Sequence, residues 1–445
     1  MKILFISLGC DKNLVDSEEM LGLLKRAGHE ITNEESEAEI AVINTCSFIH
    51  DAKDESVETV LEMCELKKNG MLKGIILTGC LVQYYQGDIK KELPEVDAVL
   101  GTTSYEDIVN AVAAVCKGEY MEVYKSIDYL PRFTADRIVT TGGFTAYLKI
   151  AEGCDKHCTY CVIPSLRGRY RSVPLEDVLE CANRLAADGI RELVIVAQET
   201  TVYGLDLYGK KMLPELLRRL ADIEGLYWLR LLYCYPEEID EALIAEMARN
   251  PKVCHYIDMP IQHASDAVLR RMGRRTTQAE IREKIAALRA AMPDIVLRTT
   301  LIAGFPGETE EDHALAMDFI DEMEFQRLGV FTYSCEENTP AAKLTPQIPQ
   351  EQAEGWKEEL MALQQEISYD LNTAMKGKLL EAVIEGYLYE EDVYVARSYM
   401  DAPNVDGYVF VSSSRELMSG SLVKVRITDC SEYDLIGELA DEFTE

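Results

Sequence analysis

Three cysteines lie close together in the segment 153–161: Cys154, Cys158 and Cys161. Thiolates bind soft metals and hold iron–sulfur clusters, usually four thiolates to a cluster. Because only three are local here, one iron would lack a protein ligand, and such an open position is what a catalytic metal site keeps. Zinc is the alternative, with His157 as fourth ligand, although structural zinc sites usually take two separated pairs of ligands. The spacing favours a reactive iron–sulfur site.

Three further cysteines, Cys10, Cys46 and Cys80, each end a short run rich in β-branched residues. Amphipathic stretches separate these runs, and the alternation predicts a parallel Rossmann- or flavodoxin-like sheet with helices on both faces. Ends of parallel strands share one edge, where ligands bind, so we expect the three thiols to meet there. The alternative is three small buried side chains, since free cysteine is commonly buried. The predicted strands are 2–10, 39–46 and 73–80, and the predicted helices are 17–27 and 52–68.

The stretch 144–360 alternates strands and helices again, and the cysteine triplet directly follows its first strand. Six such units predict a TIM-type (β/α) barrel, complete or partial, with its active site at the carboxyl ends of the strands. A further helix is predicted over 350–375. The six predicted strands are 144–152, 192–199, 227–233, 255–261, 295–304 and 328–334.

The last part of the chain changes character and reads as five short strands, at 379–387, 392–398, 407–413, 421–429 and 435–440. This pattern predicts a small antiparallel β-barrel of the OB-like kind. The chain is therefore α/β overall, with predicted domains at 1–130, 140–375 and 376–445 and a linker at 131–143.

Composition sets bounds on the class of protein. The chain has 445 residues, a net charge of −33 and 47% apolar residues, which is ordinary for a soluble globular protein and excludes disorder as its main state. No apolar run approaches the roughly 20 residues that span a bilayer. The start resembles a lipoprotein signal ending at Cys10, but its apolar part is too short. We therefore predict a cytoplasmic protein with reduced cysteines and no membrane partner.

The spacing C-x3-C-x2-C resembles the signature of the radical S-adenosylmethionine (SAM) superfamily. The resemblance implies that Cys154, Cys158 and Cys161 hold a 4Fe-4S cluster and that SAM ligates the fourth iron. Reductive cleavage of SAM would give a 5′-deoxyadenosyl radical, which abstracts hydrogen from an unactivated carbon. The protein's share is binding and orientation. Tyr160 matches the aromatic residue before the third cysteine, whose backbone contacts the adenine.

The resemblance extends over the whole chain to the methylthiotransferases of that superfamily. It is carried by the segments 7–18, 43–48, 78–83 and 146–172, and by a tail similar in size to their TRAM domain. It implies that Cys10, Cys46 and Cys80 hold a second 4Fe-4S cluster, whose open iron carries the sulfur. One SAM molecule would supply the methyl group and another the radical, so that C–H becomes C–S–CH3.

Six further residues at or near predicted strand ends are candidates for binding SAM. The motifs 197–201 and 300–307 resemble family motifs, although the family usually has Asp where Glu199 stands. The alternatives are a helix N-cap, a turn glycine and ordinary polar residues at the barrel mouth. The six candidates are Gln198, Glu199, Arg230, Gln262, Ile302 and Gly304.

Two branches of the family differ in substrate. One modifies an adenosine of tRNA, and the other modifies the β-carbon of an aspartate in small-subunit ribosomal protein number twelve. The segments 8–18, 333–341 and 397–407 resemble the second branch, although Asn338 stands where that branch usually has Gly. The tail motif supplies candidate substrate-binding residues, namely Arg397, Tyr399, Asp401 and Asp406.

The distribution of charge gives an independent indication of the substrate. The net charge is −11 over residues 1–135, −13 over 136–375 and −9 over 376–445, so the tail is the most acidic part per residue. A barrel that grips tRNA should be basic, whereas an acidic one suits a basic ribosomal protein. The alternative is a merely solvated acidic surface. Basic runs at 167–171 and 270–275 fit ribosomal RNA, or carboxylates of cofactor and substrate.

These observations predict a two-cluster radical enzyme that methylthiolates an aspartate of a ribosomal protein. The alternatives are methylthiolation of tRNA by the same chemistry and a non-catalytic iron–sulfur or zinc scaffold. The expected partners are the basic ribosomal protein, a flavodoxin- or ferredoxin-like electron donor and a sulfur donor. We expect the enzyme to be a monomer.

Overall fold

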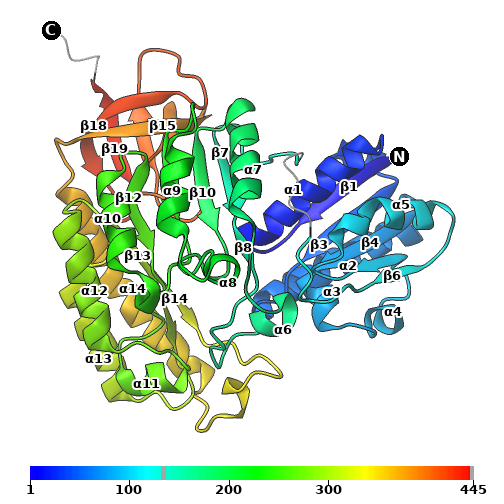
Figure 1. Cartoon of the computed structure of the whole chain (residues 1–445), viewed down its shortest axis with the longest axis horizontal. Coiled ribbons are helices and arrows are strands. Elements are labelled where there is room, and N and C mark those ends of the chain that lie inside the picture. Colours follow the sequence, from blue (N-terminus) through cyan, green and yellow to red (C-terminus); the bar gives the residue numbers. More distant parts are fainter. Residues whose placement is uncertain (132–136, 441–445) are drawn as a thin grey trace.

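The computed structural model describes residues 1–131 and 137–440 and shows three α/β or β units in chain order (Figure 1). An N-terminal parallel sheet stands beside a larger central parallel sheet, and a closed C-terminal barrel sits on one end of the central sheet. The predicted fold class is confirmed.

The N-terminal unit is a six-stranded parallel sheet in the order β2-β1-β3-β4-β5-β6. Helices α1 (Asp11–Arg26) and α5 (Ile108–Cys116) cover one face, and α2 (His50–Lys68) covers the other. Its central strands β3 and β4 are buried along their whole length, which explains their continuous apolar runs. The strands are β1 (Lys2–Ser7), β2 (Glu30–Thr32), β3 (Ile40–Thr45), β4 (Gly74–Gly79), β5 (Ala98–Leu100) and β6 (Met121–Val123), and two short helices are α3 (Cys80–Tyr84) and α4 (Ile89–Glu92).

The central unit is a six-stranded parallel sheet in the order β14-β13-β12-β11-β10-β7, with β7 and β14 as open edges. It is therefore a partial barrel. Side chains of β10 alternate, so that Leu193 and Ile195 pack under the outer helices while Val194 and Val196 face the concave side. The strands are β7 (Thr145–Lys149), β10 (Glu192–Val196), β11 (Trp228–Leu231), β12 (Val253–Asp258), β13 (Val296–Ala303) and β14 (Arg327–Thr332).

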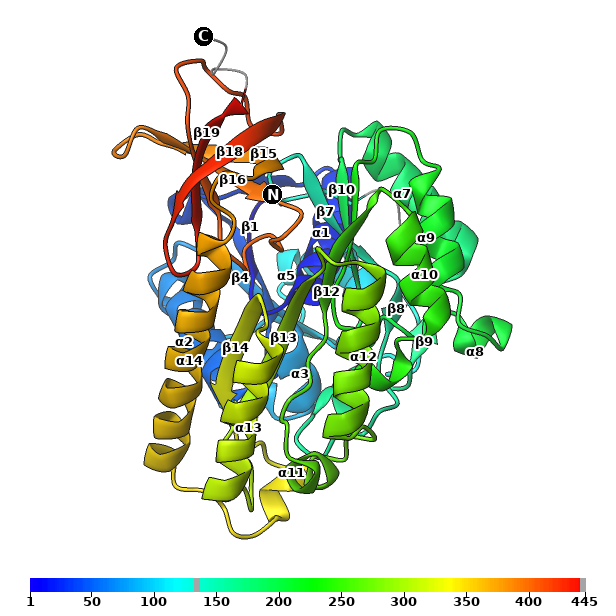
Figure 2. The same cartoon turned by 90° about the vertical axis from the view of Figure 1, so that its left-hand side faces the viewer.

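Helices line the convex side of this sheet (Figure 2). They are α7 (Leu175–Ala187), α9 (Leu213–Ala221), α10 (Glu241–Arg249), α12 (Gln278–Ala291), α13 (Glu310–Met323) and α14 (Gln350–Thr373), the last of which matches the predicted helix. Shorter elements lie at the strand ends: β8 (Ala151–Glu152), β9 (Arg171–Ser172), α6 (Ile163–Arg167), α8 (Leu205–Tyr208) and α11 (Asp266–Arg271).

The C-terminal unit is a closed barrel in the order β15-β16-β17-β19-β18. It is not wholly antiparallel as predicted, because β17 and β19 pair in parallel. Its apolar interior is continuous with the concave face of the central sheet, where Tyr147, Val194 and Tyr256 join the same cluster. The strands are β15 (Leu379–Leu388), β16 (Val393–Ser398), β17 (Val409–Ser412), β18 (Leu422–Cys430) and β19 (Leu435–Leu439).

The predicted linker 131–143 lies partly outside the described residues, at 132–136. Its described second half is anchored to the N-terminal unit. Thr140 donates from its backbone N–H to Glu18 Oε1 at 2.7 Å, and Arg137 pairs with the same buried carboxylate at 3.5 Å. Residues 137–140 therefore tie the two units together.

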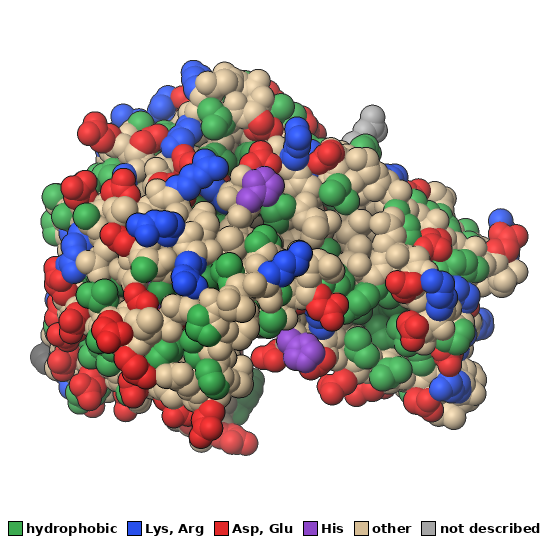
Figure 3. Space-filling model, turned by 90° about the horizontal axis from the view of Figure 1, so that it is seen from below, with side chains coloured by type: hydrophobic (Ala, Val, Ile, Leu, Met, Phe, Trp, Pro, Cys, Tyr) green, Lys and Arg blue, Asp and Glu red, His purple; other side chains and the backbone are tan. Residues whose placement is uncertain are grey.

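The face opposite the C-terminal barrel is indented at one edge between the central and N-terminal lobes (Figure 3). Acidic and basic side chains are interspersed over this face. Within the described residues, no helix is long and apolar enough to cross a membrane.

Candidate active site

The first cysteine triplet lies on the loop that follows β8, at the carboxyl end of β7. The loop folds back on its own continuation, because Cys154 donates its backbone N–H to Gly168 O at 3.2 Å and β8 pairs antiparallel with β9. Gly153 has φ +80°, and a Cβ there would lie 2.1 Å from Arg169 O. Only glycine fits at this approach of two backbones.

The thiols of this triplet lie in a largely enclosed setting. Cys154 and Cys158 are buried and Cys161 is half-buried. Burial raises the pKa of both Cys154 and Cys161 to about 12, so both thiols hold their protons at neutral pH until a metal displaces them. Tyr235 Oη lies 3.5 Å from Cys158 Sγ.

The second triplet lies at the carboxyl edge of the N-terminal sheet, as predicted. Cys10 immediately precedes α1, Cys46 follows β3 and Cys80 begins α3 directly after β4, and β1, β3 and β4 are adjacent strands. A Cβ on Gly9 would lie 2.8 Å from Cys46 Sγ. Burial, with the neighbouring Cys80, raises the pKa of Cys46 to about 12.

The donor chemistry of both triplets fits an iron–sulfur cluster. Over residues 1–131 and 137–440, no three His, Cys, Asp or Glu side chains converge as the ligands of a single metal ion. Thiolates on a cubane cluster each bind a different iron and therefore stand further apart than the ligands of one ion. His157, the proposed fourth zinc ligand, is exposed. Three strand-end thiols per site suit a cluster.

The two triplets face each other across the boundary between the N-terminal and central units. Arg167 of α6 donates from Nη2 to Cys80 Sγ at 3.5 Å. The segment after β11 touches both sides, because Tyr233 Oη donates to Asp11 Oδ1 at 3.1 Å, next to Cys10, while Tyr235 lies against Cys158. The domain boundary therefore brings six thiols into one region.

Several of the residues predicted to bind SAM lie close to one another near the first triplet. Tyr160 and Ile302 pack into one small cluster with Phe305, whose ring lies 6.3 Å from that of Tyr160. Gln262 follows β12 and has φ +71°. Its backbone N–H donates to Thr300 O and its backbone carbonyl accepts from the Ile302 N–H, both at 2.8 Å, so this segment pairs with β13.

Polar groups complete this region. Gln198 donates to Glu152 Oε1 at 2.7 Å, and burial raises the pKa of Glu199 to about 7 despite its bond from the Thr201 backbone N–H. Among the described residues, Gln198 Oε1, Glu199 Oε2 and Arg274 Nε are buried without a hydrogen-bond partner. These three atoms lie near the first triplet, where Lys156 Nζ stands 3.8 Å from Glu199 Oε2, and they suit a ligand that carries amino and carboxylate groups.

Gly304, just after β13, lies against helix α14. Its φ is +75°, and a Cβ there would lie 2.2 Å from Ala353 Cβ of α14. The glycine lets α14 approach the end of β13, so its placement gives no support for contact with SAM.

Contrary to the prediction from the sequence, the structure does not place Arg230 at the barrel mouth. Its fully buried side chain donates from Nε to Glu192 Oε1 at 2.8 Å and from Nη1 to Tyr399 O at 2.6 Å. It stands within β11, on the face that the C-terminal barrel covers, and is satisfied there by partners of this chain.

Within the tail motif, Arg397 and Asp401 are likewise buried, whereas Tyr399 and Asp406 are half-buried and remain candidates. Arg397 pairs with Glu192, Asp401 with Arg327 at 2.6 Å, and Asp406 with Arg298 at 3.3 Å. Arg397 and Asp401 are 0% and 1% exposed, so they offer no surface to a substrate. Tyr399 Oη donates to Asp294 O at 3.1 Å. The motif joins the terminal barrel to the central sheet.

Four residues at this site were not predicted: Arg167, Tyr233, Tyr235 and Arg274. Arg167 and Arg274 fall in the basic runs already noted, where sequence alone leaves the role open. The guanidinium of Arg274 stacks over the Tyr235 ring, 4.2 Å from its centroid. Tyr233 has φ +60°, and the flanking sequence does not predict this left-handed conformation.

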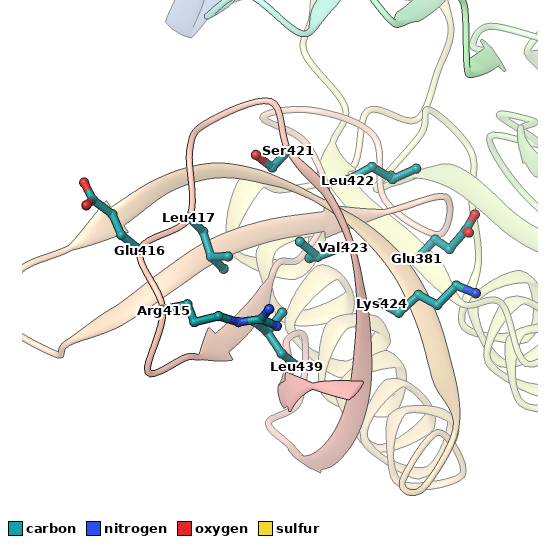
Figure 4. A pocket seen from close by; sticks show the side chains of 9 residues that line it. All are labelled: Glu381, Arg415, Glu416, Leu417, Ser421, Leu422, Val423, Lys424 and Leu439. Atoms are coloured by element: carbon teal, nitrogen blue, oxygen red, sulfur yellow. The ribbon is translucent and has the colours of Figure 1, made fainter. Parts of the chain in front are cut away.

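A cavity of about 560 Å³ opens on the C-terminal barrel, away from these residues (Figure 4). None of the predicted cysteines or SAM candidates lines it, so it does not belong to the site. Its lining residues are Glu381, Arg415, Glu416, Leu417, Ser421, Leu422, Val423, Lys424 and Leu439.

Family models match all three units. The uncharacterized protein family UPF0004 matches residues 2–101, the radical SAM superfamily matches residues 148–320 and the TRAM domain matches residues 377–440. Among solved structures, the radical SAM methyltransferase TsrM from Kitasatospora setae aligns with TM-score 0.55 at 16% identity over 76% of each chain. The cobalamin-dependent radical SAM enzyme OxsB aligns with TM-score 0.51 at 13% identity over 82% of this chain and 56% of its own. Both likenesses concern the fold.

Curated relatives are much closer in sequence. The ribosomal protein uS12 methylthiotransferase RimO of Lachnoclostridium phytofermentans is 58% identical over 98% of this chain and 99% of its own. RimO of a Thermoanaerobacter species is 48% identical over 97% of this chain and 98% of its own. Since identity at this level runs the length of both chains, the protein belongs to the RimO family of ribosomal protein uS12 methylthiotransferases, within the radical SAM superfamily.

Proposed function

We propose that this protein methylthiolates ribosomal protein uS12, at the β-carbon of an aspartate. The observation that carries the proposal is the meeting of two cysteine triplets across one domain boundary, with Arg167 of the radical SAM unit in contact with Cys80 of the other. The relatives' names supply the reaction and the substrate.

Cys154, Cys158 and Cys161 would hold one 4Fe-4S cluster, and Cys10, Cys46 and Cys80 a second. When bound, the clusters and SAM supply the radical that removes hydrogen, and the sulfur and methyl group that replace it. The chain itself keeps this region dry and oriented, because four of the six thiols are buried beneath strand-end loops.

The residues proposed to orient SAM are those that gather beside the first triplet. Tyr160 and Ile302 offer an apolar wall, and Gln198, Glu199 and Gln262 offer polar groups just after the ends of β10 and β12. The orphaned oxygens of Gln198 and Glu199 would find partners in a bound amino group. Arg274 is added as a candidate partner for a carboxylate.

Charge supports a basic protein as the substrate. The terminal barrel is acidic, and its buried Arg397 is already paired with Glu192 of the central sheet. A TRAM domain also suggests contact with RNA, so we propose that ribosomal RNA near uS12 is touched as well. A flavodoxin- or ferredoxin-like donor would supply electrons, a separate donor the sulfur, and the enzyme would act as a cytoplasmic monomer.

The test offers the reduced, anaerobically reconstituted enzyme a uS12 loop peptide and a tRNA in the same assay. Mass spectrometry then shows which one gains a methylthio group. We expect the peptide to gain it at its aspartate. A methylthio group gained only by the tRNA would contradict the proposed substrate and favour tRNA methylthiolation. Failure to cleave SAM would contradict the radical mechanism and favour a non-catalytic scaffold.

Two sets of variants separate the roles of the triplets. Replacing Cys10, Cys46 and Cys80 by Ala should abolish methylthio transfer while SAM cleavage continues. Replacing Cys154, Cys158 and Cys161 by Ala should abolish both. Cys116, an exposed cysteine of the N-terminal unit, gives the matched control. Sulfur transfer that survives the first set would contradict the second cluster.

A further inference from the structure

Arg167 is the side chain that links the two thiol triplets. It is 2% exposed, and it ends the short helix that begins two residues after Cys161. That helix enters the N-terminal unit, where Val162 and Leu166 pack against Cys80 and Thr102 Oγ1 donates to Leu166 O at 2.8 Å.

The guanidinium has a distinct acceptor for each of the four hydrogens on its terminal nitrogens. Nη1 donates to Asp16 Oδ2 at 2.7 Å and to Glu152 Oε2 at 3.4 Å. Nη2 donates to Asn13 Oδ1 at 2.9 Å and to Cys80 Sγ at 3.5 Å. Because the fork is planar and rigid, the first three bonds fix the direction of the fourth.

We propose that Arg167 is a positioning residue of the N-terminal cluster, holding the Cys80 sulfur by a charged hydrogen bond and raising the reduction potential of that cluster. The inference rests on the proposed function, since it requires that Cys80 be a cluster ligand.

The physical reason is the charge that reduction adds. Hydrogen bonds to ligand sulfurs and nearby charge are among the factors that set the potential of an iron–sulfur cluster. A buried cation that donates to a ligand sulfur stabilises the more negative, reduced state, and burial keeps water from screening it.

Replacement of Asp16 distinguishes an effect of Arg167 on the cluster from a purely structural role. Asp16 belongs to the same buried network, but among the described residues its carboxylate accepts from Lys149 and Arg167 rather than from a cysteine. Losing Asp16 should therefore disturb domain packing much as losing Arg167 does. It removes a negative charge near the cluster, so any effect on the potential has the opposite sign.

The experiment uses the full chain with Cys154, Cys158 and Cys161 replaced by Ala, so that only the N-terminal cluster remains. After anaerobic reconstitution, a redox titration followed by electron paramagnetic resonance measures its midpoint potential in the parent, Arg167→Gln, Arg167→Lys and Asp16→Asn chains. Arg169→Gln is the matched control, since Arg169 is an exposed arginine of the same loop.

We expect Arg167→Gln to favour the oxidised cluster about tenfold, a shift of about 59 mV to lower potential for one electron. Arg167→Lys should shift it less in the same direction, because Lys keeps the charge but loses the fork. Asp16→Asn should leave the potential unchanged or raise it, and Arg169→Gln should leave it unchanged.

An unchanged potential in every Arg167 variant that loads a cluster would overturn the inference. So would failure of both Arg167 variants to fold, matched by Asp16→Asn, because this would make Arg167 purely structural. Failure of the parent to load any cluster would instead contradict the proposed function.

Discussion

Arg397 of the terminal barrel grips the carboxylate of Glu192, at the start of β10, with both terminal amino groups, at 3.2 Å and 2.5 Å. Both side chains are fully buried. Burial alone would raise the pKa of Glu192, but Arg397 and then Arg230 outweigh it and lower that pKa to about 2. The barrel is therefore held to the central sheet by a charged pair away from water.

Replacing Arg397 by Leu should destabilise this interface by about 3–5 kcal/mol, because it leaves a buried carboxylate short of one cation. Urea unfolding followed by the fluorescence of Trp228, which packs in the same interface, measures the loss in a Trp356→Phe background. Lys424→Ala, at an exposed cation of the same barrel, should change stability by less than about 0.5 kcal/mol. Equal effects of the two variants would contradict the role of the pair.

Glu19 gives a prediction with a definite pH sign. Burial raises its pKa to about 7, above the unfolded value near 4.5, so the folded state holds the extra proton between these values. Stability therefore falls as pH rises from about 4.5 to 7. Glu19→Gln should stabilise the protein at pH 8 by about 1–3 kcal/mol and have little effect at pH 4. Thermal unfolding at both values checks this, with exposed Glu34→Gln as control.

Gly153→Ala should impair assembly of the first cluster site. The added Cβ meets the Arg169 carbonyl at 2.1 Å, and a backbone atom has no easy way to move aside. We expect at least half of the bound iron to be lost in a chain with Cys10, Cys46 and Cys80 replaced by Ala, measured after reconstitution. Gly142→Ala is the control, with φ +82° but open space around it, so it carries only conformational strain. An equal iron content in both variants would contradict the prediction.

Gly304→Ala should destabilise the central unit by about 1–3 kcal/mol through overpacking against Ala353. Ala353→Gly removes the opposing Cβ at a cost of about 0.5–1 kcal/mol in a helix. The double variant should therefore melt above Gly304→Ala alone in calorimetry. Simple additivity of the two losses would show that the close approach is not the cause.

The sequence was most informative where chemistry coincides with strand ends. Cys10, Cys46 and Cys80 were predicted to meet because alternating strands and helices dictate a shared sheet edge, and the structure places them just after the carboxyl ends of three adjacent strands. The number and length of apolar runs likewise predicted six central strands and a five-stranded terminal barrel, but did not decide whether the central barrel closes.

Long-range pairing was not predictable in the same way. Arg397 and Glu192 lie 205 positions apart, and nothing local indicates that one covers the other. The resemblance of the tail motif to the family therefore suggested a binding surface, whereas Arg397 and Asp401 pair with residues of the central sheet. The site contacts of Tyr233 and Arg167 also depend on how the N-terminal unit docks.

The charged interface beneath the terminal barrel has a consequence for how a large substrate is handled. Swinging the barrel away would separate Arg397 from Glu192 and take the Ser398 and Tyr399 carbonyls away from Arg230, so the barrel is held in a fixed position on the central sheet. A molecule bound to the outer surface of the barrel would therefore lie at a fixed distance from the loop that carries the first cysteine triplet.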